Sequence, residues 1–458
     1  MFCRIPTGSF TSDGTIFVSP TKNGIKNYTL AYGPSDDTKQ NLISEIKSSE
    51  ELTPETDPKQ EEEDLMIISA SSSSASLFPS RASVNEEGGG EMEAVCGTIR
   101  QAPVLCAAVV ASSPLVILLL NDYSGQAGEE RQSYLSRQLV YVYDAAQGTV
   151  LAQIALVDLY AETLRVNKDY IVVAGKEQFR VIDLTSLSSV AEQLTIDPPN
   201  PHLILELSAE ADTRVHHQTA TAYHRIVFPY EESGLDRLDK KRGVLWILHI
   251  PVPSSPKKET FCQTIAAHQH AIANVCLNEN GSLVVSASQS GQVLRLFAST
   301  GGNLLGEFRR GMQDSSLLAM RLESDVMEGH GNSLSGGVKV ALYCLSHHST
   351  IHVFRSTVSS LSGKPPEVRS VVKITLYGGV SDDSFYRRPS GSLDQRKNKF
   401  QLMTCGGGTV LWVAHYFYTK RTDGNRDCFM TRLMRYNLLN VNSSTVPDET
   451  LDIPYSDG

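Results

Sequence analysis

The chain has 458 residues with 41 basic and 51 acidic side chains, which gives a formal net charge of -10. Hydrophobic residues make up 41% and charged residues 20%, a balance that is typical of folded globular proteins and excludes fibrous and wholly disordered classes. The acidic charge is concentrated, because residues 34–93 hold 15 acidic and 4 basic side chains, whereas the other 398 residues hold 36 and 37.

The chain begins without the apolar core of a signal peptide, and two strand-like runs follow, GTIFVSP and NYTLAYG. Residues 34–93 are of low complexity, with acidic, serine-rich and glycine-rich parts. Such a composition buries too little apolar surface to offset the entropy lost on ordering. We therefore expect a disordered acidic insertion at 34–93, inside one domain formed by 1–33 and 94–440 and followed by a tail at 441–458.

The stretch 102–120 contains no charged side chain and is close to the length of a membrane-spanning helix. Pro103 and the run Ser112-Ser113-Pro114 interrupt it. Proline removes a backbone donor and breaks a helix, so two buried strands joined by a turn are favoured over a membrane span.

The rest of the chain alternates short apolar runs with glycine, asparagine, aspartate and serine turns, and amphipathic helical patterns are nearly absent. This pattern indicates an all-β sandwich, barrel or propeller. Residues 170–194, 283–308 and 341–356 share one layout of strands and turns, and four-stranded repeats of about 40–50 residues favour propeller blades. We predict a seven-bladed, WD40-like β-propeller. His224 falls in a stretch without a clear strand pattern and is expected in a solvated loop.

The stretch 267–311 resembles the fifth blade of the PROPPINs, the WD-repeat-like, phosphoinositide-binding propellers of autophagy that are also called the WIPI family. The hallmark is the FRRG motif, which consists of Phe308, Arg309, Arg310 and Gly311. Segments from SFTSDGTIFVSPTKNG (9–24) to LYCLSHHSTIHVF (342–354) are similar to other blades, so the resemblance covers most of the chain.

The residues of the motif have a chemistry of their own. Neighbouring side chains on a strand point to opposite faces, so Arg309 and Arg310 are expected to serve two separate pockets. A guanidinium binds phosphate oxygens through two parallel hydrogen bonds. We expect two pockets of arginine, serine, threonine and histidine without a carboxylate partner, which suits a phosphorylated inositol ring.

The resemblance implies two sites for phosphatidylinositol 3-phosphate, and in some members also for phosphatidylinositol 3,5-bisphosphate. For the first site it implies His268, Ser288 and Arg309, and for the second it implies Arg310, Ser346, Thr350 and His352. The chain departs from the family at Ser290-Gly291-Gln292, where Lys-Gly-Thr is usual.

Residues 356–398 mix basic, aromatic and aliphatic side chains, a composition that suits an anionic membrane surface. The resemblance implies a long membrane-contacting loop of the sixth blade at this place. An alternative stays open, in which SVVKITLY (370–377) is the outer strand of that blade and the loop is shorter.

The resemblance implies a non-enzymatic phosphoinositide effector that recruits autophagy machinery, such as the large lipid-transfer protein of autophagy, to membranes. We expect a monomer in the cytoplasm, bound peripherally to preautophagosomal, endosomal or vacuolar membranes, with no cofactor, metal or nucleic acid. Eight scattered cysteines without a Cys-x-x-Cys pair favour free thiols in a reducing compartment. The alternative function is a β-propeller scaffold that binds only proteins.

Overall fold

Every regular element in the described part of the chain is a β-strand. The computed structural model describes residues 6–10, 16–21, 24–30, 43–46, 68–69, 104–121, 138–156, 159–190, 194–195, 203–212, 221–230, 243–255, 259–325, 337–359, 365–376, 398–405, 407–419, 428–439 and 447–455. Within these ranges, no helix has the length and apolar character needed to cross a membrane.

The described strands form seven sheets, which we number one to seven in chain order. Sheet one comprises β1 (Ser9–Phe10), β2 (Ile16–Thr21), β3 (Gly24–Leu30) and β4 (Ile43–Ile46). Sheet two comprises β5 (Ile68–Ser69), β6 (Val104–Val109), β7 (Leu115–Asn121), β8 (Gln138–Asp144) and β9 (Thr149–Leu156). Sheet three comprises β10 (Thr163–Val166), β11 (Tyr170–Ala174), β12 (Gln178–Asp183) and β13 (Leu194–Thr195).

The second half of the chain repeats this order. Sheet four comprises β14 (Glu206–Leu207), β15 (Tyr223–Tyr230), β16 (Val244–Pro251) and β17 (Phe261–Ala266). Sheet five comprises β18 (Ile272–Leu277), β19 (Leu283–Ser288), β20 (Val293–Ala298), β21 (Leu304–Arg309) and β25 (Glu367–Arg369). Sheet six comprises β22 (Leu317–Asp325), β23 (Val338–Ser346), β24 (Thr350–Val358) and β26 (Val372–Thr375). Sheet seven comprises β27 (Asn398–Cys405), β28 (Val410–Thr419), β29 (Cys428–Asn437) and β30 (Glu449–Pro454).

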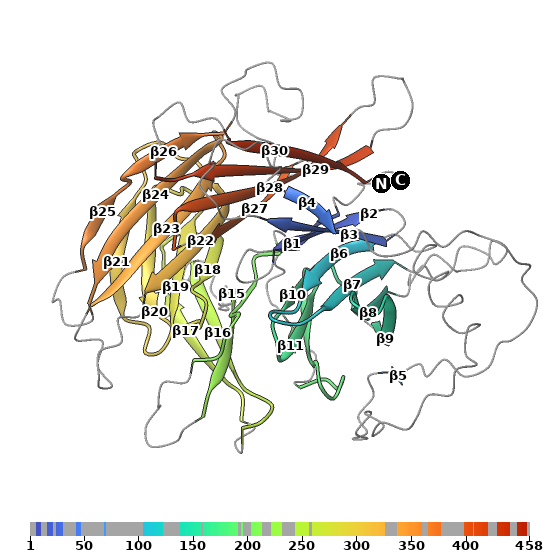
Figure 1. Ribbon diagram of the computed structural model, residues 1–458. Helices are drawn as coiled ribbons and strands as arrows, with labels where there is room; N and C mark the ends of the chain where they lie inside the picture. The colour runs from blue at the N-terminus through green and yellow to red at the C-terminus, as the bar shows by residue number, and fades with distance from the viewer. Residues whose placement is uncertain are drawn as a thin grey trace, which may run out of the picture.

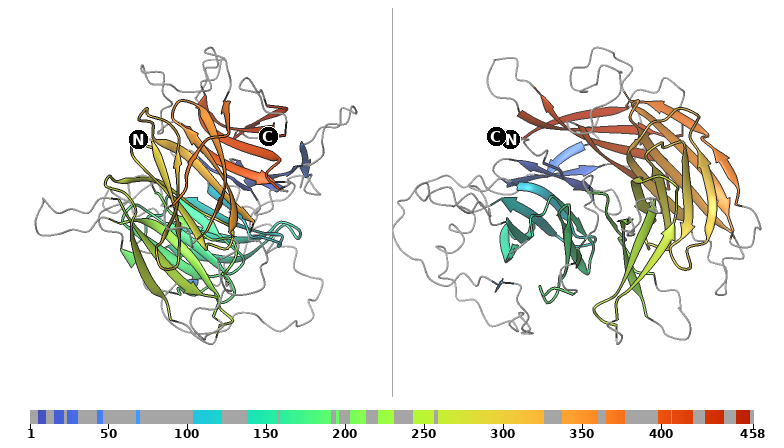
Figure 2. Two further views of the ribbon diagram at one scale, coloured as in Figure 1. Left: turned by 90° about the vertical axis from the view of Figure 1, so that its left-hand side faces the viewer. Right: turned by 180° about the vertical axis from the view of Figure 1, so that it is seen from behind.

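Successive sheets pack face to face around a common axis, which confirms the prediction of an all-β propeller (Figures 1 and 2). Each boundary is filled by apolar side chains from both sheets, such as Phe308 of sheet five against Phe354 of sheet six. Phe17 of sheet one packs with Trp412 of sheet seven, so the last sheet meets the first. The cores therefore lie between the sheets, and polar residues are left at the rims.

The seven sheets are not all described to the same extent. Six of the sheets carry described side chains along most of their strands, whereas sheet one does so only at a few positions such as Phe10 and Phe17. The structure thus shows six blades in full, and the count of seven stays a prediction.

Two of the predicted segments contain described strands. Residues 34–93 contain β4 and β5, and the remainder of that range lies outside the described residues, so a disordered insertion is not confirmed. The predicted tail at 441–458 contains β30, which pairs with β29 as the outer strand of sheet seven. This short run ends in a proline and carries acidic residues, so its strand character comes from pairing rather than from its own pattern.

The uncharged stretch 102–120 forms β6 and β7, an antiparallel pair in sheet two. The backbone turns at Ser112, which adopts a left-handed conformation with φ of 56°. The prediction of two buried strands joined by a turn is confirmed.

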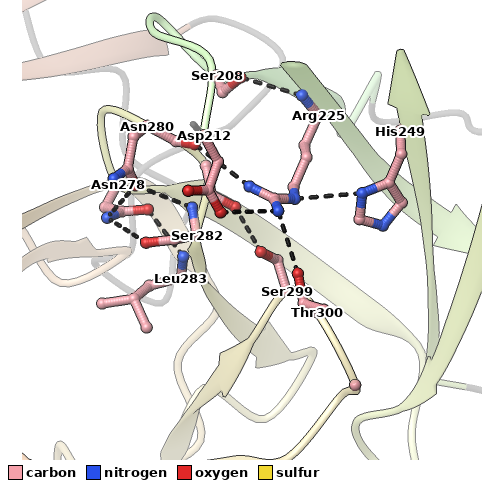
Figure 3. Close-up of polar contacts among 12 residues, drawn as sticks. Ser208, Asp212, Arg225, His249, Asn278, Asn280, Ser282, Leu283, Ser299 and Thr300 are labelled. Atoms are coloured by element: carbon pink, nitrogen blue, oxygen red, sulfur yellow. Dashed lines mark hydrogen bonds and ion pairs between the residues drawn. The ribbon is translucent and has the colours of Figure 1, made fainter. Parts of the chain in front are cut away.

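Polar side chains tie neighbouring sheets together near the turns. Arg225, at 1% exposed, lies on β15 and contacts Asp212 Oδ2 at 2.9 Å, His249 Nδ1 at 3.3 Å and Thr300 Oγ1 at 3.1 Å (Figure 3). The Asn278 amide donates to Ser282 Oγ in the same sheet and to Ser324 Oγ in sheet six. These contacts satisfy polar groups that burial would otherwise leave costly.

The expectation for His224 is wrong. His224 lies on β15 with no exposed surface, and its Nε2 is 2.6 Å from Asp169 Oδ2 while its Nδ1 is 3.0 Å from Asn167 Nδ2. The sequence pattern did not predict this burial, because the polar partners of His224 lie on a neighbouring sheet and are distant in the sequence.

Candidate functional site

The FRRG motif ends β21, and its side chains alternate between the two faces of sheet five. Phe308 has no exposed surface and packs toward sheet six against Phe354, with ring centroids 5.5 Å apart. Arg310 lies two positions after Phe308 and therefore points to the same face of the sheet. Arg309 lies two positions after Glu307 and points to the other face, which it shares with Arg295, the strand partner of Glu307. The two arginines therefore lie on opposite faces of the sheet, as strand geometry predicts.

Arg310 is buried, at 8% exposed, in the boundary between sheets five and six. Its Nε donates to the Gly291 carbonyl at 2.8 Å, and its Nη2 donates to the Gln313 carbonyl. Burial lowers the pKa of Arg310 from its ordinary value. Two backbone carbonyls thus orient the guanidinium without neutralising its charge.

The predicted residues of the second site lie opposite Arg310 on sheet six. Thr350 and His352 alternate with Ile351 and Val353 on β24. The side chains of Ile351 and Val353 pack in the core between sheets six and seven. Thr350 and His352 therefore face sheet five. Ser346 ends the neighbouring β23, and its backbone carbonyl accepts from the Ser349 amide at 3.0 Å.

Several polar atoms at this boundary are buried and have no partner within the described protein. They are the side-chain atoms Ser346 Oγ, Ser315 Oγ and His352 Nδ1, and a further such atom, Ser349 Oγ, lies in the turn between β23 and β24. A buried hydroxyl or imidazole without a partner costs about 1–3 kcal/mol, so such atoms point to a ligand that would pair with them.

His352 is held neutral at neutral pH. Burial, together with the charges of Arg310 and Lys373, lowers the pKa of His352 to about 4. Lys373, on β26, is the strand partner of His352. The sequence analysis did not assign Lys373 to the site. If 370–377 is taken as the outer strand of the blade, Lys373 comes to lie beside β24 and its site residues. The structure shows that alternative, since β26 pairs with β24.

The first predicted site lies on the other face of sheet five, toward sheet four. His268 Nε2 is 3.0 Å from Ser286 Oγ, and burial together with the charge of Arg295 lowers the pKa of His268 to about 4. Ser288 Oγ is 3.1 Å from Ser290 Oγ. The charge of Glu307 also acts on His268, and this carboxylate lies 3.8 Å from Arg309 Nη2.

The expectation that neither arginine has a carboxylate partner is wrong for Arg309. Its Nε lies 2.7 Å from Glu367 Oε1, and its Nη2 lies 3.8 Å from Glu307 Oε2. These pairs are exposed to solvent, since the Arg309 side chain is 46% exposed. Glu367 comes from β25, whose return to sheet five from beyond β24 has no signal in the sequence.

Arg295 is a further cation of this face that sequence reasoning missed. Its Nε is 2.9 Å from Glu307 Oε1, and its Nη1 donates to the Ala267 carbonyl at 2.8 Å. It lines a cavity of ≈ 340 Å³ between sheets four and five, together with Ala267, Phe297 and Leu304. A lone arginine inside the run VLRLF is the signal that would have found it.

The predicted membrane loop at 356–398 is in part regular structure. β24 extends to Val358, and β25 and β26 follow. Residues 360–364 and 377–397 lie outside the described residues, so the proposed membrane contact of those parts stays a prediction.

Comparison with known proteins agrees with these features. A family model described as PROPPIN matches residues 252–355, a range that contains the whole motif and every predicted site residue. Autophagy-related protein 18e of Arabidopsis thaliana is 32% identical over 112 residues, which cover 24% of this chain and 26% of that protein. Autophagy-related protein 18 of Aspergillus oryzae is 25% identical over 255 residues, which cover 52% of this chain and 55% of that protein.

The chain thus spans between about a quarter and about half the length of the curated relatives that it matches. Among solved structures, Kluyveromyces lactis Hsv2 with complete loop 6CD aligns with a TM-score of 0.50 at 13% identity, over 95% of this chain and 99% of that one, which shows the fold alone. The family-model match and the autophagy-related relatives support a likeness to the PROPPINs, which the family model places at residues 252–355.

Proposed function

We propose that this chain is a non-enzymatic phosphoinositide effector with seven blades that binds phosphatidylinositol 3-phosphate, and also phosphatidylinositol 3,5-bisphosphate, through two rim sites. The first site is built around Arg309 with His268 and Ser288, and the second around Arg310 with Ser346, Thr350 and His352. Both sites flank β21, so one strand would hold two headgroups on the same edge of the propeller.

The observation that carries this proposal is the buried group of unpartnered polar atoms opposite Arg310. A phosphate monoester offers several acceptor oxygens to one guanidinium and to hydroxyl groups at the same time. The Ser346 and Ser349 hydroxyls would donate to those oxygens, and the charge of Arg310 would balance the anion. A protein-only scaffold gives no reason to bury an arginine beside hydroxyls that lack partners.

Two weak sites on one edge would act together on a membrane. Once a first headgroup is bound, a second lipid in the same bilayer meets its site at a high effective concentration. Each charge-assisted hydrogen bond contributes roughly 1.5–3 kcal/mol, so each site alone would bind modestly and the pair would bind firmly. The propeller would then stand on its rim and recruit autophagy proteins, including a lipid-transfer protein, from the cytoplasm to preautophagosomal, endosomal or vacuolar membranes.

Vesicle flotation tests this function against the scaffold alternative. The wild-type chain should float with vesicles that contain phosphatidylinositol 3-phosphate and stay at the bottom with vesicles that contain unphosphorylated phosphatidylinositol. An Arg309→Thr/Arg310→Thr variant should stay at the bottom with both. If wild type and variant behave alike on both vesicles, the chain is a scaffold and lipid recognition is refuted.

A further inference from the structure

A three-residue strand from the sheet-six connection covers the outer edge of the FRRG strand. β25 pairs with β21 in parallel, with Phe308 opposite Val368 and Arg309 opposite Arg369. The Glu307 amide donates to the Pro366 carbonyl at 3.0 Å, and Val368 packs against the core between sheets five and six. Figure 1 shows β25 beside β21 at the rim. β25 is therefore attached through backbone, apolar and ionic contacts.

The ionic contact of β25 falls on the arginine of the first proposed site. Glu367 Oε1 lies 2.7 Å from Arg309 Nε, a distance that is normal for a charge-assisted hydrogen bond. A carboxylate presents two oxygens to a guanidinium in the way that a phosphate does. Glu367 thus takes the place on Arg309 that a headgroup phosphate needs.

The second proposed site differs in this respect. The described hydrogen bonds of the Arg310 guanidinium go to the carbonyls of Gly291 and Gln313, and neither brings a negative charge. An anion that reaches Arg310 therefore has no carboxylate to displace from that guanidinium. The two arginines of the motif therefore differ. Arg309 is paired with a carboxylate, whereas Arg310 is held by backbone carbonyls in an orientation suited to a ligand.

We propose that β25 is a detachable strap that masks the first site, so that a phosphoinositide headgroup binds Arg309 only by displacing Glu367. This inference rests on the proposed function and adds regulation to it. The second site fills first, and the first site opens when the lipid density is high enough to compete with the carboxylate. Any change that weakens the hold of β25 on β21 raises the affinity of the chain for membranes.

A glutamine at position 367 keeps the size of the side chain and removes its charge. Vesicle binding is measured in an Arg310→Thr background, where only the first site remains, with vesicles that contain phosphatidylinositol 3-phosphate. Glu367→Gln should tighten binding about two- to five-fold, the range that exposed ion pairs support. Glu210→Gln is the matched control, because Glu210 forms an exposed ion pair with Lys168 on another part of the rim.

Hydrogen exchange gives a second readout on the full chain. Binding to the same vesicles should speed exchange at the Glu307 amide, which β25 protects, and vesicles without the phosphorylated lipid should not. If Glu367→Gln and Glu210→Gln bind alike, while wild type still requires Arg309, the strap is refuted and the proposed function stands. If wild type ignores the phosphorylated lipid altogether, the proposed function fails and the strap with it.

Discussion

The guanidinium of Arg310 on sheet five acts across the boundary on the imidazole of His352 on sheet six, and helps to hold the pKa of His352 at about 4. Burial is the larger cause, and Lys373 on β26 adds to it. The pocket thus carries two cations and a neutral histidine, and the charge of Asp314 also acts on Arg310, so one positive charge is left for an anion to balance.

The two histidines of the proposed sites make stability depend on pH. The pKa of His268 and that of His352 are both lowered from 6.5 to about 4 in the folded chain, mainly by burial. Between these values the unfolded chain binds more protons than the folded one, so the free energy of unfolding falls as pH drops from 6.5 toward 4. We expect a loss of about 1–2 kcal/mol per histidine at pH 5, measured by urea unfolding.

A His352→Gln variant should lose part of that pH dependence, because glutamine does not titrate. A His268→Gln variant should remove the other part, because the pKa of His268 is lowered mainly by burial in the same way. An identical slope in wild type and His352→Gln would contradict the assignment.

Gly291 supports Arg310 through its backbone. Its φ of 59° lies in the left-handed region, and a Cβ there would approach the Ser315 carbonyl oxygen to 2.1 Å. Gly291→Ala should destabilise the fold by about 1–3 kcal/mol, because the turn must shift, and should weaken binding at the second site.

The matched control is Gly301→Ala, which has φ of 80° but whose nearest contact would be Asn303 Nδ2 at 3.6 Å. The Gly301→Ala variant should lose stability through backbone strain alone, without a steric clash of the new Cβ, and it should still bind lipid. Equal loss of lipid binding in both variants would mean that the Gly291 carbonyl does not position Arg310.

Phe308 is expected to be structural rather than ligand-binding. Phe308→Ala should lower the free energy of unfolding by about 3–5 kcal/mol, since it leaves a cavity between sheets five and six, and Phe308→Leu should lower it less. Chemical denaturation measures both. A stable Phe308→Ala chain that has lost vesicle binding would place Phe308 in the ligand contact instead.

The buried pair of Arg225 and Asp212 should contribute strongly to stability. Asp212→Ala leaves a guanidinium in the interior beside His249, so the free energy of unfolding should fall by about 3–5 kcal/mol. Glu210→Gln breaks the exposed pair with Lys168 and should change it by less than about 1 kcal/mol. If both variants lower the free energy of unfolding in urea by a similar amount, burial of the Arg225–Asp212 pair does not increase its contribution to stability.

The propeller and the divergence of Arg309 and Arg310 were predictable because they depend on local rules. Strand alternation alone puts consecutive arginines on opposite faces, and the prolines and serines of 102–120 alone exclude a continuous helix. The same alternation places Thr350 and His352 toward Arg310 once β24 is known to be a strand.

The features that escaped prediction depend on contacts between distant segments. Glu367 meets Arg309 only because β25 returns to an earlier sheet, and parallel pairing over such a distance leaves no periodic signal. His224 is buried because Asn167 and Asp169 of another sheet satisfy it. β30 belongs to sheet seven through its partner β29 rather than through its composition.

The central claim is that Arg309 and Arg310 serve two separate headgroup sites. Calorimetric titration of the full chain with the soluble headgroup, inositol 1,3-bisphosphate, tests it most directly. The account predicts two headgroups per wild-type chain, one for Arg309→Thr, one for Arg310→Thr and none for the double variant. A single headgroup per wild-type chain, or the loss of all binding in either single variant, would contradict it.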